Sequence, residues 1–144
     1  MTTRREVLHT IGLAAAVTLI PGCGGGDGDA SGVPTGKATM CGANLCLLLS
    51  ENSELQAVDG IMFFPQAPGK KLFVQRTSDT TFQAMSAVCT HAGCTVAFNG
   101  TDKFNCPCHG SSFSSAGAVL NGPAGTPLRI FPTALAGDEL TITL

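Results

Sequence analysis

Two short runs of residues constrain this chain more strongly than any other feature of its sequence. They span Cys89–Cys94 (CTHAGC) and Cys106–Ser111 (CPCHGS), separated by residues 95–105. Each run begins with a cysteine and carries a histidine two or three positions later, a spacing suited to two ligands of one metal centre. The candidate ligands are Cys89, His91, Cys106 and His109.

Chemistry alone leaves three interpretations of these residues open. Two thiolates and two imidazoles would bind a single zinc ion tetrahedrally. They would equally hold a [2Fe-2S] cluster, with two cysteines on one iron and two histidines on the other. The cysteines alone would also suit the disulfide framework of a small secreted domain, but that interpretation leaves the placement of the histidines unexplained.

The two runs resemble the cluster-binding loops of the Rieske [2Fe-2S] protein family. Each run holds a second cysteine, Cys94 or Cys108, and Gly110-Ser111 follows the histidine of the second run. This pattern resembles the disulfide-containing type, such as the Rieske subunit of quinol-cytochrome c oxidoreductases. The resemblance implies that the two leading cysteines bind the inner iron and that the two histidines bind the outer iron. It also implies a disulfide between Cys94 and Cys108.

The resemblance assigns roles to residues around the cluster as well. Ser111 matches the serine whose hydroxyl donates to a bridging sulfide and raises the reduction potential; otherwise it is a solvent-facing loop serine. Gly122, Pro123 and Ala124 resemble the loop that covers the cluster, or else form a generic turn. Phe113 stands where the high-potential members carry a tyrosine that donates to a ligand sulfur. One hydrogen bond should therefore be missing, and we expect an intermediate reduction potential.

The first run departs from the respiratory members of the family at Ala92, where they usually carry a leucine that shields the cluster and shapes quinol docking. The resemblance nevertheless implies a one-electron transfer subunit of a membrane-associated respiratory oxidoreductase, of the quinol-cytochrome c reductase type. Its expected partners are electron-donor and acceptor proteins, with cytochrome b, cytochrome c and quinol as candidates. The alternatives are the small Rieske subunit of a periplasmic molybdenum enzyme and a stand-alone periplasmic carrier.

Two other classes of Rieske protein fit the sequence less well. An oxygenase needs a mononuclear iron held by two further histidines and a carboxylate. The chain has one other histidine, His9, and it lies in a segment expected to be removed. Ferredoxins that feed oxygenases resemble this site in ligand spacing, but they typically lack the inter-loop disulfide and are cytosolic.

Residues 1–22 resemble an export signal. Arg4 and Arg5 precede an apolar stretch, Ile11–Ile20, which is well short of the roughly 20 residues that cross a bilayer. Paired arginines suggest the twin-arginine route, which carries folded cargo. We therefore expect a protein exported across the cytoplasmic membrane.

Cys23 resembles the lipidated first residue of a mature lipoprotein, with ordinary cleavage nearby as the alternative. Residues 23–40, rich in glycine, are expected to form a flexible tether, with order beginning near Met40. Such a lipid anchor would hold the domain at the membrane on the periplasmic side.

The chain has seven cysteines, an odd number for an exported protein, and lipidation of Cys23 would remove the oddity. Once the ligands and the inter-loop pair are set aside, Cys41 and Cys46 remain. An oxidising compartment would allow a second, local disulfide between them. Alternatively, Cys46 stays a small buried hydrophobe within the apolar run Leu45–Leu49.

Length and pattern predict one small all-β domain at residues 41–144, since 144 residues leave no room for a second core. Short strand-like runs separated by turn signals predict an antiparallel sandwich or barrel, with one helix-like stretch at residues 51–60. The resemblance places a cluster-binding subdomain at about residues 87–125 on this base. The expected strands are residues 45–50, 61–64, 71–76, 81–86, 95–98, 103–105, 118–120, 128–131 and 140–144.

Charge argues against a nucleic-acid partner. The formal net charge is −2, and the basic residues beyond the N-terminal segment form no stripe in the sequence.

Overall fold

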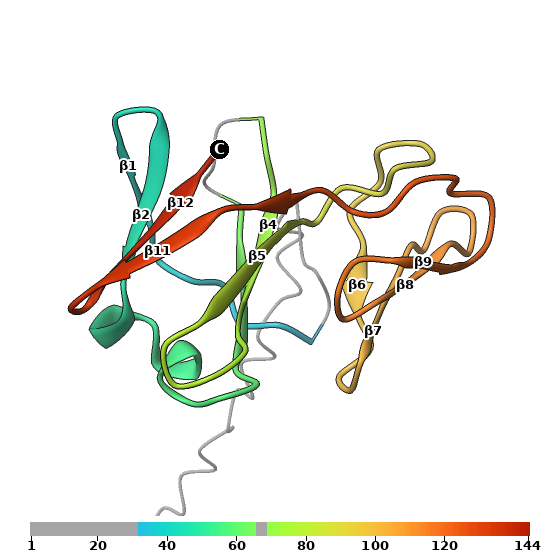
Figure 1. The fold of residues 1–144 in the computed structure, drawn as a ribbon. Coiled ribbons are helices and arrows are strands. Elements are labelled where there is room, and N and C mark those ends of the chain that lie inside the picture. Colours follow the sequence, from blue (N-terminus) through green and yellow to red (C-terminus); the bar gives the residue numbers. More distant parts are fainter. Residues whose placement is uncertain (1–31, 66–68) are drawn as a thin grey trace, which may run out of the picture.

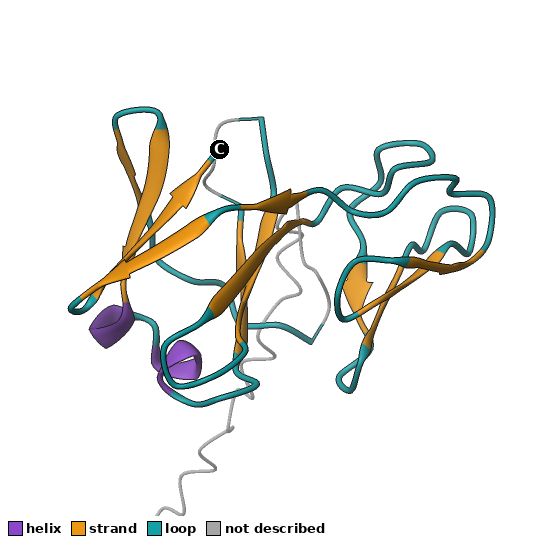
Figure 2. Ribbon diagram, in the orientation of Figure 1, coloured by secondary structure: helices purple, strands orange, loops and turns teal. Residues whose placement is uncertain are grey.

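The computed structural model describes residues 32–65 and 69–144. Helix in this part of the chain is limited to two short 3-10 turns, η1 (Leu49–Glu51) and η2 (Ser53–Gln56), where a helix-like stretch was expected. The strands form three four-stranded antiparallel sheets (Figure 2), so the expected all-β fold is confirmed. They are β1 (Thr39–Cys41), β2 (Asn44–Leu48), β3 (Ile61–Phe64), β4 (Leu72–Arg76), β5 (Phe82–Ser86), β6 (Ala97–Phe98), β7 (Lys103–Asn105), β8 (Ser112–Ser114), β9 (Val119–Asn121), β10 (Ile130–Phe131), β11 (Thr133–Ala136) and β12 (Glu139–Thr143).

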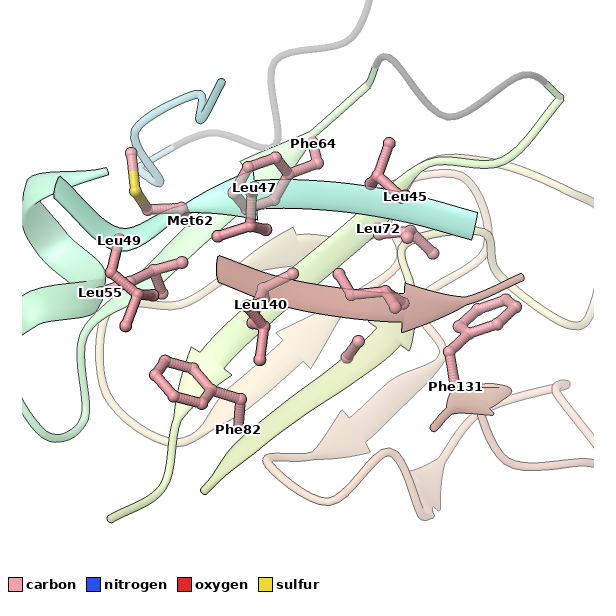
Figure 3. Close-up of a cluster of buried hydrophobic side chains, with 13 residues drawn as sticks. Leu45, Leu47, Leu49, Leu55, Met62, Phe64, Leu72, Phe82, Phe131 and Leu140 are labelled. Atoms are coloured by element: carbon pink, nitrogen blue, oxygen red, sulfur yellow. The ribbon is translucent and has the colours of Figure 1, made fainter. Parts of the chain in front are cut away.

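Two of the sheets build the base of the molecule. Their strand orders are β1-β2-β12-β11 and β10-β5-β4-β3. Apolar side chains from both sheets meet between them in a first core (Figure 3), where Leu45, Leu140 and Leu72 are almost completely buried. Burying side chains of this size stabilises the fold by roughly 1.5–3 kcal/mol each.

The sheet β10-β5-β4-β3 is buried on both faces, because successive side chains of a strand point to opposite sides. Phe64 faces the first core, whereas its neighbour Phe63 belongs to a second core on the other face. In that second core the Phe73 ring lies 4.7 Å from the ring of Phe104 in β7. This contact anchors the third sheet, β6-β7-β8-β9, to the base.

The third sheet belongs to a segment inserted between β5 and β10 (Figure 1). The chain leaves the middle sheet after Ser86 and returns to it at Ile130. The amide of Ser86 donates to the carbonyl oxygen of Arg129 over 2.8 Å, so the outgoing and returning segments lie side by side. We refer to this crossing point as the neck.

Ordered packing begins before Met40, where the glycine-rich tether was expected to end. The side chain of Val33 is buried, and the amide of Gly36 donates to the carbonyl oxygen of Phe63 over 2.8 Å. A Cβ atom at Gly36 would lie 2.2 Å from the Phe64 ring, so only glycine allows this close approach. Composition alone does not reveal such packing.

Several N-terminal features lie outside the described residues. They are the export segment at residues 1–22 and the lipidation candidate Cys23. Among the residues that are described, no helix combines the length and the apolar character needed to span a membrane.

Cys41 and Cys46 form a disulfide, which settles the alternative that the sequence left open. Their Cα atoms lie 5.8 Å apart in the β1-β2 hairpin. Cys46 is nevertheless buried, as its apolar neighbours suggested, while Cys41 is exposed. The bridge therefore closes the hairpin at the edge of the base.

Candidate metal centre

The two runs singled out in the sequence form loops with the same backbone hydrogen bonds. In the first loop the amide of Cys89 donates to the carbonyl oxygen of Cys94, and the amide of Gly93 donates back to Cys89. In the second loop Cys106 pairs with Ser111 in the same way, and Gly110 donates back to Cys106.

Both glycines have a φ of 77°, in the left-handed region that an L side chain rarely adopts. A glycine near the end of each run therefore allows the backbone to turn back, so that its amide reaches the carbonyl oxygen of the leading cysteine.

The thiols of Cys89 and Cys106 lie together on the buried side of these loops. Both side chains are 2% exposed and belong to the second apolar core. Burial raises the pKa of the Cys106 thiol, and a hydrogen bond with the neighbouring Cys89 thiol raises it further. Metal binding would have to displace these protons, because thiolate is the ligating form.

The two histidines occupy the opposite, solvent-facing side of the loops. His91 and His109 are both exposed, and their ring centroids are 4.8 Å apart with the planes almost perpendicular. The fold thus brings together one imidazole from each loop, although residues 92–108 separate them in the chain. The rings face solvent, while the thiols face the core.

A disulfide joins the two loops between Cys94 and Cys108, with their Cα atoms 6.5 Å apart. The sulfur atoms of this bridge and of Cys106 all lie within 4.8 Å of one another. Because both bridge sulfurs are bonded to each other, they are not thiolate ligands. Cys89 and Cys106 are the free cysteines of the described residues.

Ser111 is fully buried, so the alternative of a solvent-facing serine is wrong. Its hydroxyl oxygen accepts a 3.0 Å hydrogen bond from the amide of Ala124. Gly122 packs against the same residue so closely that a Cβ atom there would lie 2.5 Å from the Ser111 Cα. Pro123, between them, is exposed. The segment therefore closes over the second ligand loop at Ser111.

A second hydrogen bond ties the segment that follows Gly122 to the ligand loops, and it was not predicted from the sequence. The Thr90 hydroxyl donates to the carbonyl oxygen of Thr126 over 2.6 Å. Thr90 stands inside the first run, next to its leading cysteine, and its hydroxyl was the available signal. Its partner is a backbone carbonyl, which no sequence pattern marks.

Phe113 is fully buried in the second core, in β8 opposite Phe104 of β7. Its ring has no hydroxyl and donates no hydrogen bond. Ala92, the other departure, is exposed beside His91. The effect of either residue on a bound cluster stays a prediction.

The donors present fit a [2Fe-2S] cluster of mixed ligation. Two unbridged thiols converge on the buried side and two imidazoles converge on the exposed side, which matches a centre whose two irons carry different ligands. The apolar packing around the sulfurs supplies low-dielectric surroundings, and the Ser111 hydroxyl is buried next to the second ligand loop.

Comparison with known proteins agrees with this geometry. Residues 46–132, more than half of the chain, match the Rieske [2Fe-2S] domain. The chain is 38% identical over 73 residues to the cytochrome b6-f complex iron-sulfur subunit of Prochlorococcus marinus, covering 50% of this chain and 41% of the relative. It is 48% identical over 56 residues to cytochrome b6-f complex iron-sulfur subunit 1 of a Synechocystis species, covering 38% and 32%.

A solved structure of a hyperthermophilic respiratory complex III contains a similar chain. The two share 29% identity with a TM-score of 0.51, covering 66% of this chain and 71% of that one. The chain spans less than half the length of the curated relatives named above. The chain belongs to the Rieske [2Fe-2S] family, and its cofactor is a [2Fe-2S] cluster.

Proposed function

We propose that this chain is a one-electron transfer protein, the iron-sulfur subunit of a membrane-associated respiratory oxidoreductase of the quinol-cytochrome type. The observation that carries the proposal is the pair of exposed rings, His91 and His109, 4.8 Å apart above two buried thiols. Relatives named as subunits of cytochrome b6-f, and a neighbour in a respiratory complex III, support it.

In this proposal Cys89 and Cys106 hold the inner iron and the ring nitrogens of His91 and His109 hold the outer one. The bound cluster supplies a centre that gains and loses one electron. The apolar core around the two thiolates keeps water away from the inner side. The exposed rings form the edge at which electrons enter and leave, and where a quinol hydroxyl would form its hydrogen bond.

Ala92 supports a second candidate, the small Rieske subunit of a periplasmic molybdenum enzyme or a stand-alone carrier. This residue is exposed beside His91 and offers one methyl group where quinol docking is expected to need a larger apolar side chain. A protein partner that meets the ring edge directly has no such requirement.

Location is part of the same proposal. The paired Arg4 and Arg5 and the following apolar stretch support export through the twin-arginine route, and Cys23 supports a lipid anchor on the periplasmic side. A Cys23→Ser variant should move the protein from the membrane to the soluble periplasmic fraction and should not incorporate labelled fatty acid. A wild-type protein that incorporates no labelled fatty acid would contradict the lipid anchor.

The cluster and its ligands are tested on protein matured in its native host. Iron and labile sulfide should be present in equal amounts, and reduction should give a low-g paramagnetic resonance signal. His91→Ala and His109→Ala should each abolish that signal, whereas Asn105→Ala, at an exposed position of β7, should keep it. Zinc in place of iron and sulfide would contradict the proposal.

The physiological role is tested in membranes of a deletion strain. Electron flow from quinol to cytochrome c should be lost and should return with the wild-type chain but not with His109→Ala. Unchanged electron flow in the deletion strain would favour the second candidate.

A further inference from the structure

Three basic residues gather at the neck, where the chain enters and leaves the cluster-binding segment. Lys70 and Lys71 directly precede β4, and Arg129 directly precedes β10. The amide of Ala87 donates to the carbonyl oxygen of Lys71 over 2.7 Å, and the amide of Ser86 donates to that of Arg129 over 2.8 Å. The three residues therefore flank the same end of β5 from both sides, although residues 72–128 separate them in sequence.

Their side chains are held in place by the molecule itself. The Lys70 ammonium lies 5.7 Å from the centre of the Phe131 ring, and the Arg129 guanidinium lies 4.7 Å from the same centre. The Lys71 ammonium donates to the Thr95 hydroxyl over 3.0 Å, directly after the first ligand loop. We call Lys70, Lys71 and Arg129 together the basic neck.

The basic neck adjoins the expected electron-transfer edge. Lys70 and Lys71 line a shallow hollow of about 380 Å³ together with Gly93 and Thr95. Gly93 lies two residues after His91, in the same loop. A protein that covers the neck would therefore also reach the first ligand loop.

The carboxylates of the described residues lie at the other ends of the sheets. Asp79 is in the turn that joins β4 to β5, and the amide of Asp59 bonds to Arg76 at that same end. Asp138 and Glu139 lie at the β11-β12 turn, and Asp102 at the β6-β7 turn.

Figure 1 shows these turns on the lower side of the molecule, with the loops of the cluster-binding segment and the neck on the upper side. The acidic residues of the described part are Glu51, Glu54, Asp59, Asp79, Asp102, Asp138 and Glu139. Three basic residues, Lys37, Arg76 and Lys103, also lie away from the neck, so the part of the described chain outside the neck carries seven acidic and three basic residues, whereas the neck carries three basic residues.

We propose that the basic neck is the docking surface for an acidic redox protein. The partner's carboxylates lie against the three cations, and its own redox group faces the His91–His109 edge. This inference rests on the proposed one-electron function and adds the charge of the partner. Charges within about one Debye length of the contact, roughly 8 Å at physiological salt, steer the encounter and raise association rates by about 10–1,000-fold.

The test uses one protein in two charge forms as electron acceptor. Native cytochrome c is basic, and succinylation converts its lysines to carboxylates without replacing the haem. Reduced holoprotein is mixed with each ferric form in a stopped-flow instrument, and one electron passes to give the ferrous form. The second-order rate constant is measured at increasing ionic strength.

Two double variants with the same net charge provide the comparison. Lys70→Glu/Arg129→Glu reverses two cations of the neck, and Lys37→Glu/Lys103→Glu reverses two exposed lysines elsewhere. Lys70→Gln/Arg129→Gln serves as a milder variant if charge reversal prevents folding, and the paramagnetic signal reports cluster content in each.

For the wild type, the rate constant with succinylated cytochrome c should fall as salt rises. It should be about tenfold lower in Lys70→Glu/Arg129→Glu at low salt, with a smaller loss in the Gln variant and little change in Lys37→Glu/Lys103→Glu. Equal losses in the two Glu variants, or none in either, would overturn the docking surface alone. Wild-type protein that carries no cluster, or passes no electron to either form, would overturn the proposed function instead.

Discussion

The amide of Ala124 donates a buried hydrogen bond of 3.0 Å to the hydroxyl oxygen of Ser111, and so ties the covering segment to the second ligand loop. Because the oxygen accepts this bond, the Ser111 O–H remains available to donate. Its burial beside the thiol core gives such a bond a low-dielectric setting. Ser111 therefore holds the covering segment against the second ligand loop and keeps a buried hydroxyl that is free to donate.

Ser111→Ala should lower the reduction potential. A donor near the cluster stabilises the more negative, reduced state, and a hydrogen bond to a charged group is worth about 1.5–3 kcal/mol, or on the order of 100 mV for one electron. A redox titration followed by paramagnetic resonance measures the shift. Ser115→Ala, at an exposed position in the turn after β8, is the control and should leave the potential unchanged. Equal reduction potentials for the wild type and Ser111→Ala would show that the Ser111 hydroxyl does not donate to the cluster.

The wild-type potential should lie below the top of the family's range, because Phe113 cannot donate a hydrogen bond. Rieske potentials span roughly −150 to +300 mV, and we expect an intermediate value. Phe113→Tyr should raise it, because a tyrosine hydroxyl can donate a hydrogen bond to a ligand sulfur. Phe98→Tyr, on a half-buried ring that packs at a tilt against Phe104, tests whether any added hydroxyl in this sheet has the same effect. A wild-type value at the top of the range would contradict the argument.

The fold was predictable from sequence where strands carry apolar alternation and was missed where they do not. β3 (Ile61–Phe64) begins and ends as expected, because four apolar residues lie between turn signals. β1 (Thr39–Cys41) was missed because all its side chains are exposed and only pairing with β2 defines it. β8 (Ser112–Ser114) and β11 (Thr133–Ala136) are dominated by serine or alanine, which have little strand preference of their own.

The candidate ligands could be proposed from the sequence for a different reason: metal ligation imposes a local spacing that can be recognised without any knowledge of the fold. The contacts around them were not. The Thr90–Thr126 and Ser111–Ala124 bonds each join a side chain to a distant backbone group. The basic neck likewise joins residues 70, 71 and 129, which form no stripe in the sequence. Such groupings depend on the register between strands, which could not be read from local sequence patterns.

Removing the inter-loop disulfide should weaken the site more than removing the other one. The Cys94–Cys108 bridge closes a sequence separation of 14 and Cys41–Cys46 one of 5, which correspond to roughly 3 and 2 kcal/mol of chain entropy. In addition, only the Cys94–Cys108 bridge joins the two ligand loops.

Cys94→Ser/Cys108→Ser should therefore lose its cluster signal rapidly on warming. Cys41→Ser/Cys46→Ser should keep the signal until the base itself unfolds. The half-life of the visible absorbance during incubation at elevated temperature measures the difference. If both double variants lost the cluster at the same rate, the disulfide would have no specific role at the site.

Gly122→Ala should disrupt the covering segment, because glycine is required there on two grounds. Its φ is +95°, and an added Cβ would lie 2.5 Å from the Ser111 Cα. Backbone strain of this kind costs about 1–3 kcal/mol, and relieving the contact would break the neighbouring Ala124–Ser111 bond. Gly125→Ala is the matched control, since a Cβ there meets nothing within 4 Å. The variant should show a lowered midpoint of thermal unfolding and a lowered reduction potential, as in Ser111→Ala, whereas the control should show neither. A Gly122→Ala protein with the wild-type potential would mean that the segment covers the site without positioning Ser111.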